Sequence, residues 1–180
     1  MKILIITASL RKASLNAQLG QLAANFLKEM NVEVDLQSLR NFDTISYNGD
    51  IEKDKGIPAE IDLLKTKFQQ NDAFIIVSPE YNGSIPGALK NVIDWASRIK
   101  PMPYAGKWAY LMSASPSLSG GNQALWALRV PFEKFGTFVH PNMFSLASAH
   151  EAFNEDGSLK NKQLEERLKT QLKQFIEVIK

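Results

Sequence analysis

The chain has no cysteine among its 180 residues. Disulfide bonds, thiolate metal ligands and a cysteine nucleophile are therefore excluded. Histidine is nearly as scarce, and the two residues present, His140 and His150, lack the i,i+4 spacing of paired metal ligands on a helix. We therefore expect no metal site and no chemistry that depends on a thiol.

An excess of either charge is missing as well. The 21 lysines and arginines nearly balance the 19 aspartates and glutamates, and no basic run concentrates the net charge of +2. We therefore expect neither nucleic acid nor a membrane as a partner. The apolar N-terminus MKILIITASL is broken at once by Arg11 and Lys12 and is too short to span a bilayer. It predicts a buried first strand and, by default, a cytoplasmic protein.

The sequence does have a hydrophobic fraction of 44% and a length that suits one domain, residues 1–180. Nearly continuous apolar runs alternate with segments of helical periodicity. The runs predict strands at 2–8, 32–39, 73–78, 107–114 and 137–146, the last interrupted near Pro141. The periodic segments predict helices at 14–30, 58–68, 86–98, 123–135 and 158–179, with Pro131 kinking or interrupting the fourth, and a long loop at 40–56.

Five strands that alternate with five helices indicate an α/β fold, with a parallel sheet covered by helices on both faces. In such sheets, ligands bind beyond the carboxyl ends of the strands, where the strand order reverses. The loops after the first, third and fourth strands are therefore the places to look for a functional site.

The loop after the first strand, ASLRKASLN, places Ser9, Ser14 and Asn16 around Arg11 and leads directly into a helix. A helix N-terminus has unpaired backbone N–H groups and a partial positive charge that favour phosphate, and an arginine adds a charge-assisted fork. Alternatively, Ser14 only caps the helix and Arg11 is a solvated charge. The P-loop and dinucleotide-binding glycine patterns are absent, so the loop suits a terminal phosphate that does not react.

The loop after the third strand, SPEYNGSIPG, carries more special residues than a simple connection needs. Asn82-Gly83 is a strong turn dipeptide, because both residues tolerate positive φ, and Pro79 and Pro86 stiffen the chain on either side. Such a turn can direct backbone N–H groups at the polar edge of a planar ligand while Tyr81 forms an aromatic wall. The alternative, a plain strand-to-helix turn, does not explain the tyrosine or the glutamate before it.

The loop after the fourth strand, SASPSLSGGNQ, is rich in small side chains and hydrogen-bond donors. Its Gly120-Gly121 pair allows the backbone to approach a ligand closely. A flexible linker would have a similar composition, but it would have no reason to lie at the same edge of the sheet as the other two loops.

Together, these motifs resemble the NADPH-dependent FMN reductase family of flavodoxin-like proteins, which includes chromate, quinone and azo-dye reductases. The resemblance runs from ASLRKASLN through SPEYNGSIPGALKNVIDW to SGGNQALWALR. It implies a three-layer αβα sandwich whose five parallel strands have the order 2-1-3-4-5. It also implies non-covalent FMN, NAD(P)H as co-substrate, a small-molecule electron acceptor, and a homodimer or homotetramer.

The resemblance also implies which residues bind the cofactor. They are Ser9, Arg11, Ser14, Leu15 and Asn16 at the phosphate, Pro79, Glu80, Tyr81, Asn82 and Gly83 at the isoalloxazine ring, and Ser113, Ala114, Ser115, Gly120 and Gly121 on the third side. The chain departs from the family pattern at Ala8 and Ala13, where relatives often have glycine. It also has Gln123 where an arginine is common, which leaves the choice between NADPH and NADH open.

Hydride transfer is carried out by the flavin itself, so no catalytic side chain is expected. Three other functions stay open. The first is a flavodoxin-like electron carrier without NAD(P)H turnover, although such carriers tend to be strongly acidic. The second is a hydrolase that uses Ser9 or Ser115, although G-x-S-x-G is absent. The third is a non-catalytic module without flavin. Trp95, Trp108 and Trp126 are candidates for the core or for a subunit interface.

Overall fold

The computed structural model describes residues 1–180 and contains one six-stranded parallel sheet. Its strands are β1 (Lys2–Thr7), β2 (Glu33–Ser38), β3 (Ala73–Val77), β4 (Trp108–Ala114), β5 (Phe138–Val139) and β6 (Phe144–Leu146). The order β2-β1-β3-β4-β5 confirms the predicted order 2-1-3-4-5.

The fifth strand, predicted at 137–146 with an interruption near Pro141, is interrupted there more fully than expected. It is split into β5, which pairs with the start of β4, and β6, which pairs with the end of β4. Pro141 lies between the two pieces, and a proline has no N–H to donate to the ladder. The two short strands therefore share one edge of β4.

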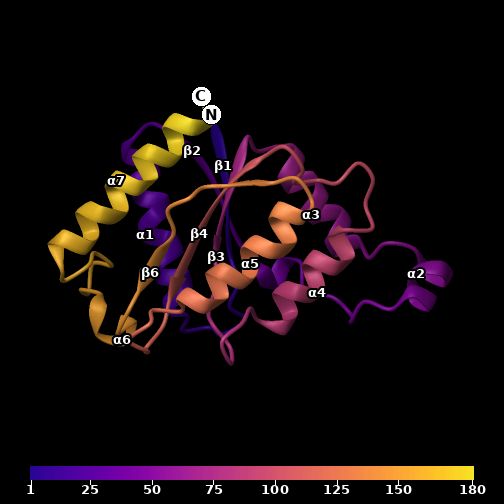
Figure 1. Cartoon of the computed structure of the whole chain (residues 1–180), viewed down its shortest axis with the longest axis horizontal. Coiled ribbons are helices and arrows are strands. Elements are labelled where there is room, and N and C mark those ends of the chain that lie inside the picture. The colour runs from indigo at the N-terminus through magenta and orange to yellow at the C-terminus, as the bar shows by residue number, and fades with distance from the viewer.

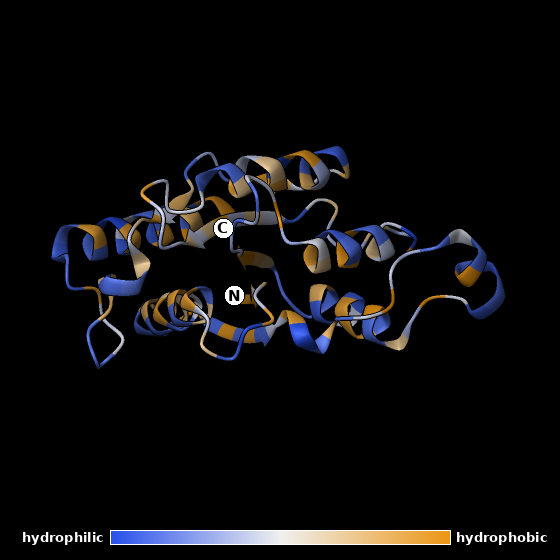
Figure 2. Cartoon of the chain, turned by 90° about the horizontal axis from the view of Figure 1, so that it is seen from below, coloured by the Kyte–Doolittle hydropathy of each residue, from blue (hydrophilic) through white to orange (hydrophobic).

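Seven helices cover the sheet. They are α1 (Leu15–Glu29), α2 (Gly49–Lys55), α3 (Ala59–Gln69), α4 (Gly87–Ala96), α5 (Asn122–Lys134), α6 (Ala149–Ala152) and α7 (Lys162–Ile179). Helices α1 and α7 lie on one face, and α3, α4 and α5 lie on the other (Figure 1). Viewed from below, the two helical layers enclose the strands, and blue hydrophilic residues are frequent along the helices (Figure 2).

The alternation of side chains along the buried strands gives each face of the sheet its own core. In β1, Ile3 and Ile5 belong to the cluster under α1 and α7, whereas Leu4 and Ile6 belong to the cluster under α3, α4 and α5. Each cluster contains 23 buried residues. Because successive side chains of a strand point to opposite faces, a nearly continuous apolar run serves both cores.

Four details of the helices differ from the sequence-based expectation. The loop predicted at 40–56 contains α2, whose helical periodicity is not visible in the sequence because none of its residues is buried. The loop predicted before the last helix contains α6, and α7 begins at Lys162 rather than at 158, because Asn161 caps it. Helix α5 is not interrupted, since it continues through Pro131 to Lys134.

The segment before α2 is fastened to α4 although α2 itself stands away from the body (Figure 1). The Trp95 indole N–H donates to the Ile45 carbonyl at 2.8 Å, and the Asn91 amide donates to the same carbonyl at 3.0 Å. Trp95 is completely buried. These contacts hold the start of the long connection against α4.

Both termini lie at the amino end of the strands, at the top of Figure 1. The loops that follow β1, β3 and β4 lie at the opposite end. No helix of the structure has the length and apolar character needed to cross a bilayer.

His140 makes the stability of this fold depend on pH. The side chain is buried between the rings of Tyr110 and Phe175, and the backbone N–H of Asn142 donates to its Nδ1 at 3.2 Å. Burial lowers the pKa of His140 below its ordinary value of 6.5. The folded state therefore favours the neutral ring. The contribution of His140 to stability is complete above pH 6.5 and decreases as the pH falls from there through the lowered pKa.

We predict that the free energy of unfolding decreases between about pH 7.5 and about pH 5.5, and that His140→Phe makes this decrease smaller. Urea denaturation at the two pH values measures it. His150→Gln is the matched control, because His150 is exposed. A decrease as large in His140→Phe as in the wild type would contradict this account.

Candidate functional site

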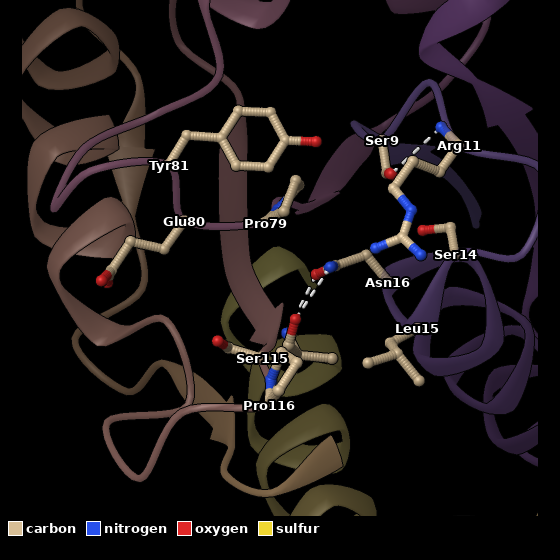
Figure 3. Close-up of a pocket in the computed structure, with 11 residues that line it drawn as sticks. Ser9, Arg11, Ser14, Leu15, Asn16, Pro79, Glu80, Tyr81, Ser115 and Pro116 are labelled. Carbon is tan, nitrogen blue, oxygen red and sulfur yellow. Dashed lines mark hydrogen bonds between the residues drawn. The ribbon is translucent and has the colours of Figure 1, made fainter. Parts of the chain in front are cut away.

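The loops after β1, β3 and β4 meet in one pocket at the carboxyl edge of the sheet (Figure 3). Its volume is about 90 Å³, and it is lined by Ser9, Arg11, Ser14, Leu15, Asn16, Pro79, Glu80, Tyr81, Ala114, Ser115 and Pro116. Pockets that enclose a whole small-molecule ligand usually measure about 300–1,000 Å³. This pocket can therefore enclose one end of a ligand of that size, and the rest of the ligand would lie in the open.

The loop after β1 provides unused hydrogen-bond donors at the start of α1. Ser14 is the N-cap, and its Oγ accepts from the Ala17 N–H at 3.2 Å. The N–H groups of Leu15 and Asn16 have no acceptor. The exposed Arg11 guanidinium makes no hydrogen bond or ion pair, whereas its backbone N–H donates to Ser9 Oγ. Free amides, a helix dipole and a free arginine are what an anionic group needs.

Asn16 has a different role from the one expected at the phosphate. Its side chain is buried, its Nδ2 donates to the Ala114 carbonyl at 2.9 Å, and its Oδ1 accepts from the Ala114 N–H at 2.9 Å. The two hydrogen bonds appear as paired dashed lines in Figure 3. This amide joins the start of α1 to the end of β4, so only its backbone N–H is free for a ligand.

The loop after β3 forms the tight turn expected from Asn82-Gly83. Tyr81 and Ser84 exchange backbone hydrogen bonds of 2.9 and 3.1 Å, and φ is +52° at Asn82 and +73° at Gly83. The N–H groups of Asn82 and Gly83 have no acceptor. The Tyr81 ring is 47% exposed and points across the pocket toward the loop after β1 (Figure 3). The turn therefore presents an aromatic surface and two free donors.

Glu80 lines the pocket, but its carboxylate points away from it (Figure 3). Glu80 Oε2 accepts from the backbone N–H of Gln123 at 2.9 Å and of Ala124 at 3.3 Å. It therefore caps α5, which has no side-chain cap from its own N-cap, Gly121. The position of Glu80 at the ring of a flavin stays a prediction, and its carboxylate joins the turn to α5.

The loop after β4 contributes Ala114 and Ser115 to the pocket, together with Pro116, which the sequence analysis did not select. Gly120 and Gly121, expected to approach a ligand, lie close to other segments of the protein. A Cβ at Gly120 would meet the Ala147 nitrogen at 2.9 Å, and one at Gly121 would meet Ser113 Cβ at 3.0 Å.

Ser113 is buried and donates to the Gly120 carbonyl at 2.6 Å. These three residues shape the loop and do not line the pocket, and Asn82 and Gly83 also lie outside its lining.

The pocket has few ionisable side chains. Arg11 is its one cationic side chain, and the carboxylate of Glu80 is engaged by α5. No histidine lines the pocket, and no group of three or more metal-ligating side chains comes together anywhere in the chain. The arrangement can bind and orient a ligand with an anionic end and a planar end, and it offers no nucleophile–base pair.

Comparison with known proteins agrees with this geometry. The family model for NADPH-dependent FMN reductase matches residues 1–151. The chain belongs to the NADPH-dependent FMN reductase family. Among relatives of this family, a quinone reductase of Escherichia coli is 35% identical over 130 residues, which cover 72% of this chain and 68% of the relative. A probable NADPH:quinone oxidoreductase 2 of Oryza sativa is 32% identical and covers 96% of this chain and 85% of the relative.

Solved structures place the family member among flavodoxin-like folds. The flavoenzyme NAD(P)H:(acceptor) oxidoreductase FerB of Paracoccus denitrificans superposes with a TM-score of 0.83 at 30% identity, covering 99% of this chain and 96% of that one. A flavodoxin of Bacillus cereus superposes with a TM-score of 0.64 at 13% identity, covering 98% of each chain. The second likeness concerns the fold alone, and together they confirm the predicted flavodoxin-like architecture.

We call the two hydrogen bonds between the Asn16 side chain and Ala114 the Asn16 clamp, and they yield a prediction for this FMN reductase family member. Asn16→Ala leaves the buried N–H and C=O of Ala114 without partners, and each such group costs about 1–3 kcal/mol. We expect a loss of about 2–4 kcal/mol in the free energy of unfolding, measured by urea denaturation. Asn16→Asp keeps the acceptor but not the donor, so its free energy of unfolding should lie between those of the wild type and Asn16→Ala.

Asn25→Ala on the exposed side of the same helix is the control and should change stability little. If Asn16→Ala and Asn25→Ala were equally stable, the clamp would not hold the loops together.

Proposed function

We propose that the protein is an NAD(P)H-dependent FMN reductase that passes electrons on to small acceptors such as quinones, azo dyes, metal oxyanions or free flavin. The observation that carries the proposal is the meeting of an anion-binding helix start and an aromatic turn in one pocket, within a chain of this family. Both features are where a flavin mononucleotide, with one charged and one planar end, needs them.

The residues present fit FMN. The free guanidinium of Arg11, the hydroxyls of Ser9 and Ser14 and the free N–H groups of Leu15 and Asn16 would hold the phosphate. Tyr81 and Pro79 would lie against the ring, and Ser115 would border it from the loop after β4. The enclosed volume of about 90 Å³ agrees with a phosphate arm that is enclosed and a ring that is open on one side.

The chain's own residues would bind and orient rather than react. FMN, when bound, supplies the hydride chemistry. The free N–H groups of Asn82 and Gly83 would donate to the polar edge of the ring, where donors fixed in advance stabilise negative charge as it develops. Glu80 holds this turn in place through α5. The open side would admit NAD(P)H and the acceptor in turn.

Turnover separates this proposal from an electron carrier. Purified protein loaded with FMN should oxidise NADPH or NADH steadily when a quinone or an azo dye is present. Binding of FMN without any oxidation of either nucleotide would favour the carrier, and a colourless protein that takes up no FMN would contradict both.

Arg11→Ala tests the phosphate assignment. We expect FMN binding to weaken by roughly 1.5–3 kcal/mol, the range for a hydrogen bond to a charged group. Quenching of flavin fluorescence during titration of the apoprotein measures the affinity. Lys12→Ala removes a neighbouring exposed charge and should change the affinity little. Unchanged affinity in Arg11→Ala would overturn the assignment.

We also propose that the protein forms a homodimer or homotetramer. Of the three tryptophans, Trp95 is buried in the core, Trp108 is partly buried, and Trp126 on α5 is 56% exposed. Val130, one turn further along α5, is 68% exposed, so the two side chains form an apolar strip.

Light scattering should give a mass above that of one chain, and Trp126→Glu should reduce it, whereas Val178→Glu on α7 should not. A monomer mass with full activity would contradict this proposal.

Two further expectations from the sequence are part of the proposal. Residues 1–180 act as one flavodoxin-like domain, supported by a single sheet that collects strands from both halves of the chain. A cytoplasmic location suits an enzyme that consumes reduced nicotinamide nucleotides. One cooperative unfolding transition and recovery in the cytoplasmic fraction are expected; two transitions, or recovery in another fraction, would contradict the respective expectation.

A further inference from the structure

A second polar pocket lies at the edge of the sheet formed by β6. It has a volume of about 340 Å³, and its lining comes from the loop after β4, the start of α5, the segment with β6, and α7. We call it the β6-edge pocket, and its residues are Ser119, Asn122, Met143, Ser145, Arg167 and Gln171. The volume is in the range of pockets that hold small-molecule ligands. None of these residues belongs to the site described above.

The cation in this pocket, the exposed Arg167, lies against an aromatic ring and has no charged partner. The Arg167 guanidinium lies 4.9 Å from the centre of the Phe144 ring, and it makes no ion pair and no hydrogen bond within the protein. Stacking on an aromatic face orients a guanidinium without using its N–H groups. Arg167 therefore offers a complete fork of donors, already positioned, to a ligand.

The two amides of the pocket are oriented as donors. Gln171 Oε1 accepts from the buried Tyr110 hydroxyl at 2.7 Å, and Asn122 Oδ1 accepts from Ser145 Oγ at 3.4 Å. With both oxygens engaged inside the protein, the NH₂ groups of both amides are left without acceptors.

No carboxylate lines the pocket. One cation and two free amide groups, without an acid, select for an anion. The N-terminus of α5 does not add to this, because Glu80 already occupies its N–H groups.

A chain of serine hydroxyls places the β6-edge pocket beside the candidate flavin site. Ser115 Oγ lies 3.0 Å from Ser117 Oγ, which lies 2.9 Å from Ser119 Oγ. Ser115 lines the first pocket and Ser119 lines the second. Two hydrogen bonds of one loop therefore connect a lining residue of the first pocket with a lining residue of the second.

We propose that the β6-edge pocket binds a phosphate group of the nicotinamide dinucleotide while its nicotinamide lies over the flavin. In a nicotinamide dinucleotide, the phosphates are separated from the reactive ring by at least one ribose, so their site must lie beside the flavin rather than on it. The pocket has the position and the donor set that this requires. The inference rests on the proposed function, because it names the site for the co-substrate of that reaction.

Arg167→Gln is the test. Binding of NADP⁺ and NAD⁺ to the FMN-loaded protein is measured by calorimetry, and KM and kcat are measured with NADPH and NADH. We expect the Kd for NADP⁺ to rise roughly tenfold to a hundredfold, the effect of losing a charged hydrogen-bond donor. Arg167→Lys, which keeps the charge without the fork, should show a smaller increase. FMN content should stay as in the wild type.

Two sources of the phosphate are distinguished in the same experiment. If Arg167→Gln raises the Kd for NADP⁺ alone, the pocket binds the 2′-phosphate, and the variant should then bind adenosine 2′,5′-bisphosphate more weakly as well. Equal increases for NADP⁺ and NAD⁺ assign the pyrophosphate. Lys173→Gln on the same helix removes one exposed positive charge outside the pocket and should leave both constants unchanged.

Gln171→Glu keeps an acceptor for the Tyr110 hydroxyl but adds a negative charge, and it should also weaken binding of the phosphate. This variant changes neither Arg167 nor Phe144, and the added carboxylate acts by repelling the phosphate and by pairing with Arg167 four residues before it on α7. Wild-type binding of both nucleotides in Arg167→Gln and in Gln171→Glu would overturn the assignment. That result is separate from a failure of the proposed function, in which the wild-type protein itself would oxidise neither NADPH nor NADH.

Discussion

The two hydrogen bonds between the Asn16 amide and the Ala114 peptide connect parts of the chain that are 98 residues apart. One partner is at the start of α1 and the other is at the end of β4, and both line the pocket. All strands run in parallel, so their carboxyl ends share one edge of the sheet. That constraint brings the loops together, and the Asn16 clamp sets the distance between two of them.

The polar groups near the site fall into two sets. Asn16, Glu80 and Ser113 have their side-chain oxygens or amides engaged by backbone groups of other loops, and they make the frame rigid. The guanidinium of Arg11 and the N–H groups at the start of α1 and in the Asn82-Gly83 turn have no partner. Because the first set is satisfied internally, it holds the frame, and the second set is free to recognise a ligand. A protein of this family needs such a frame, since it leaves the chemistry to its cofactor.

Apolar runs and turn dipeptides are local signals, so the sequence allowed the strands, the three loops and the Asn82-Gly83 turn to be predicted. The strand order was predicted from the family resemblance. It did not show where the side chains of Asn16 and Glu80 point. Their partners are 98 and 43 residues away, and no local pattern records such a contact. The charged helix α2 was missed because it buries no side chain and so has no apolar period. The sequence predicted an interruption of the fifth strand near Pro141. It did not show that the two pieces would be the separate strands β5 and β6.

The central claim is that the phosphate end and the ring end of FMN are divided between the loop after β1 and the loop after β3. The crystal structure of the FMN complex tests it most directly. The account predicts the phosphate within hydrogen-bond distance of Arg11 and the first N–H groups of α1, and the ring against Tyr81 with the Asn82-Gly83 turn at its polar edge. A phosphate bound away from Arg11, or a ring that does not contact Tyr81, would contradict it.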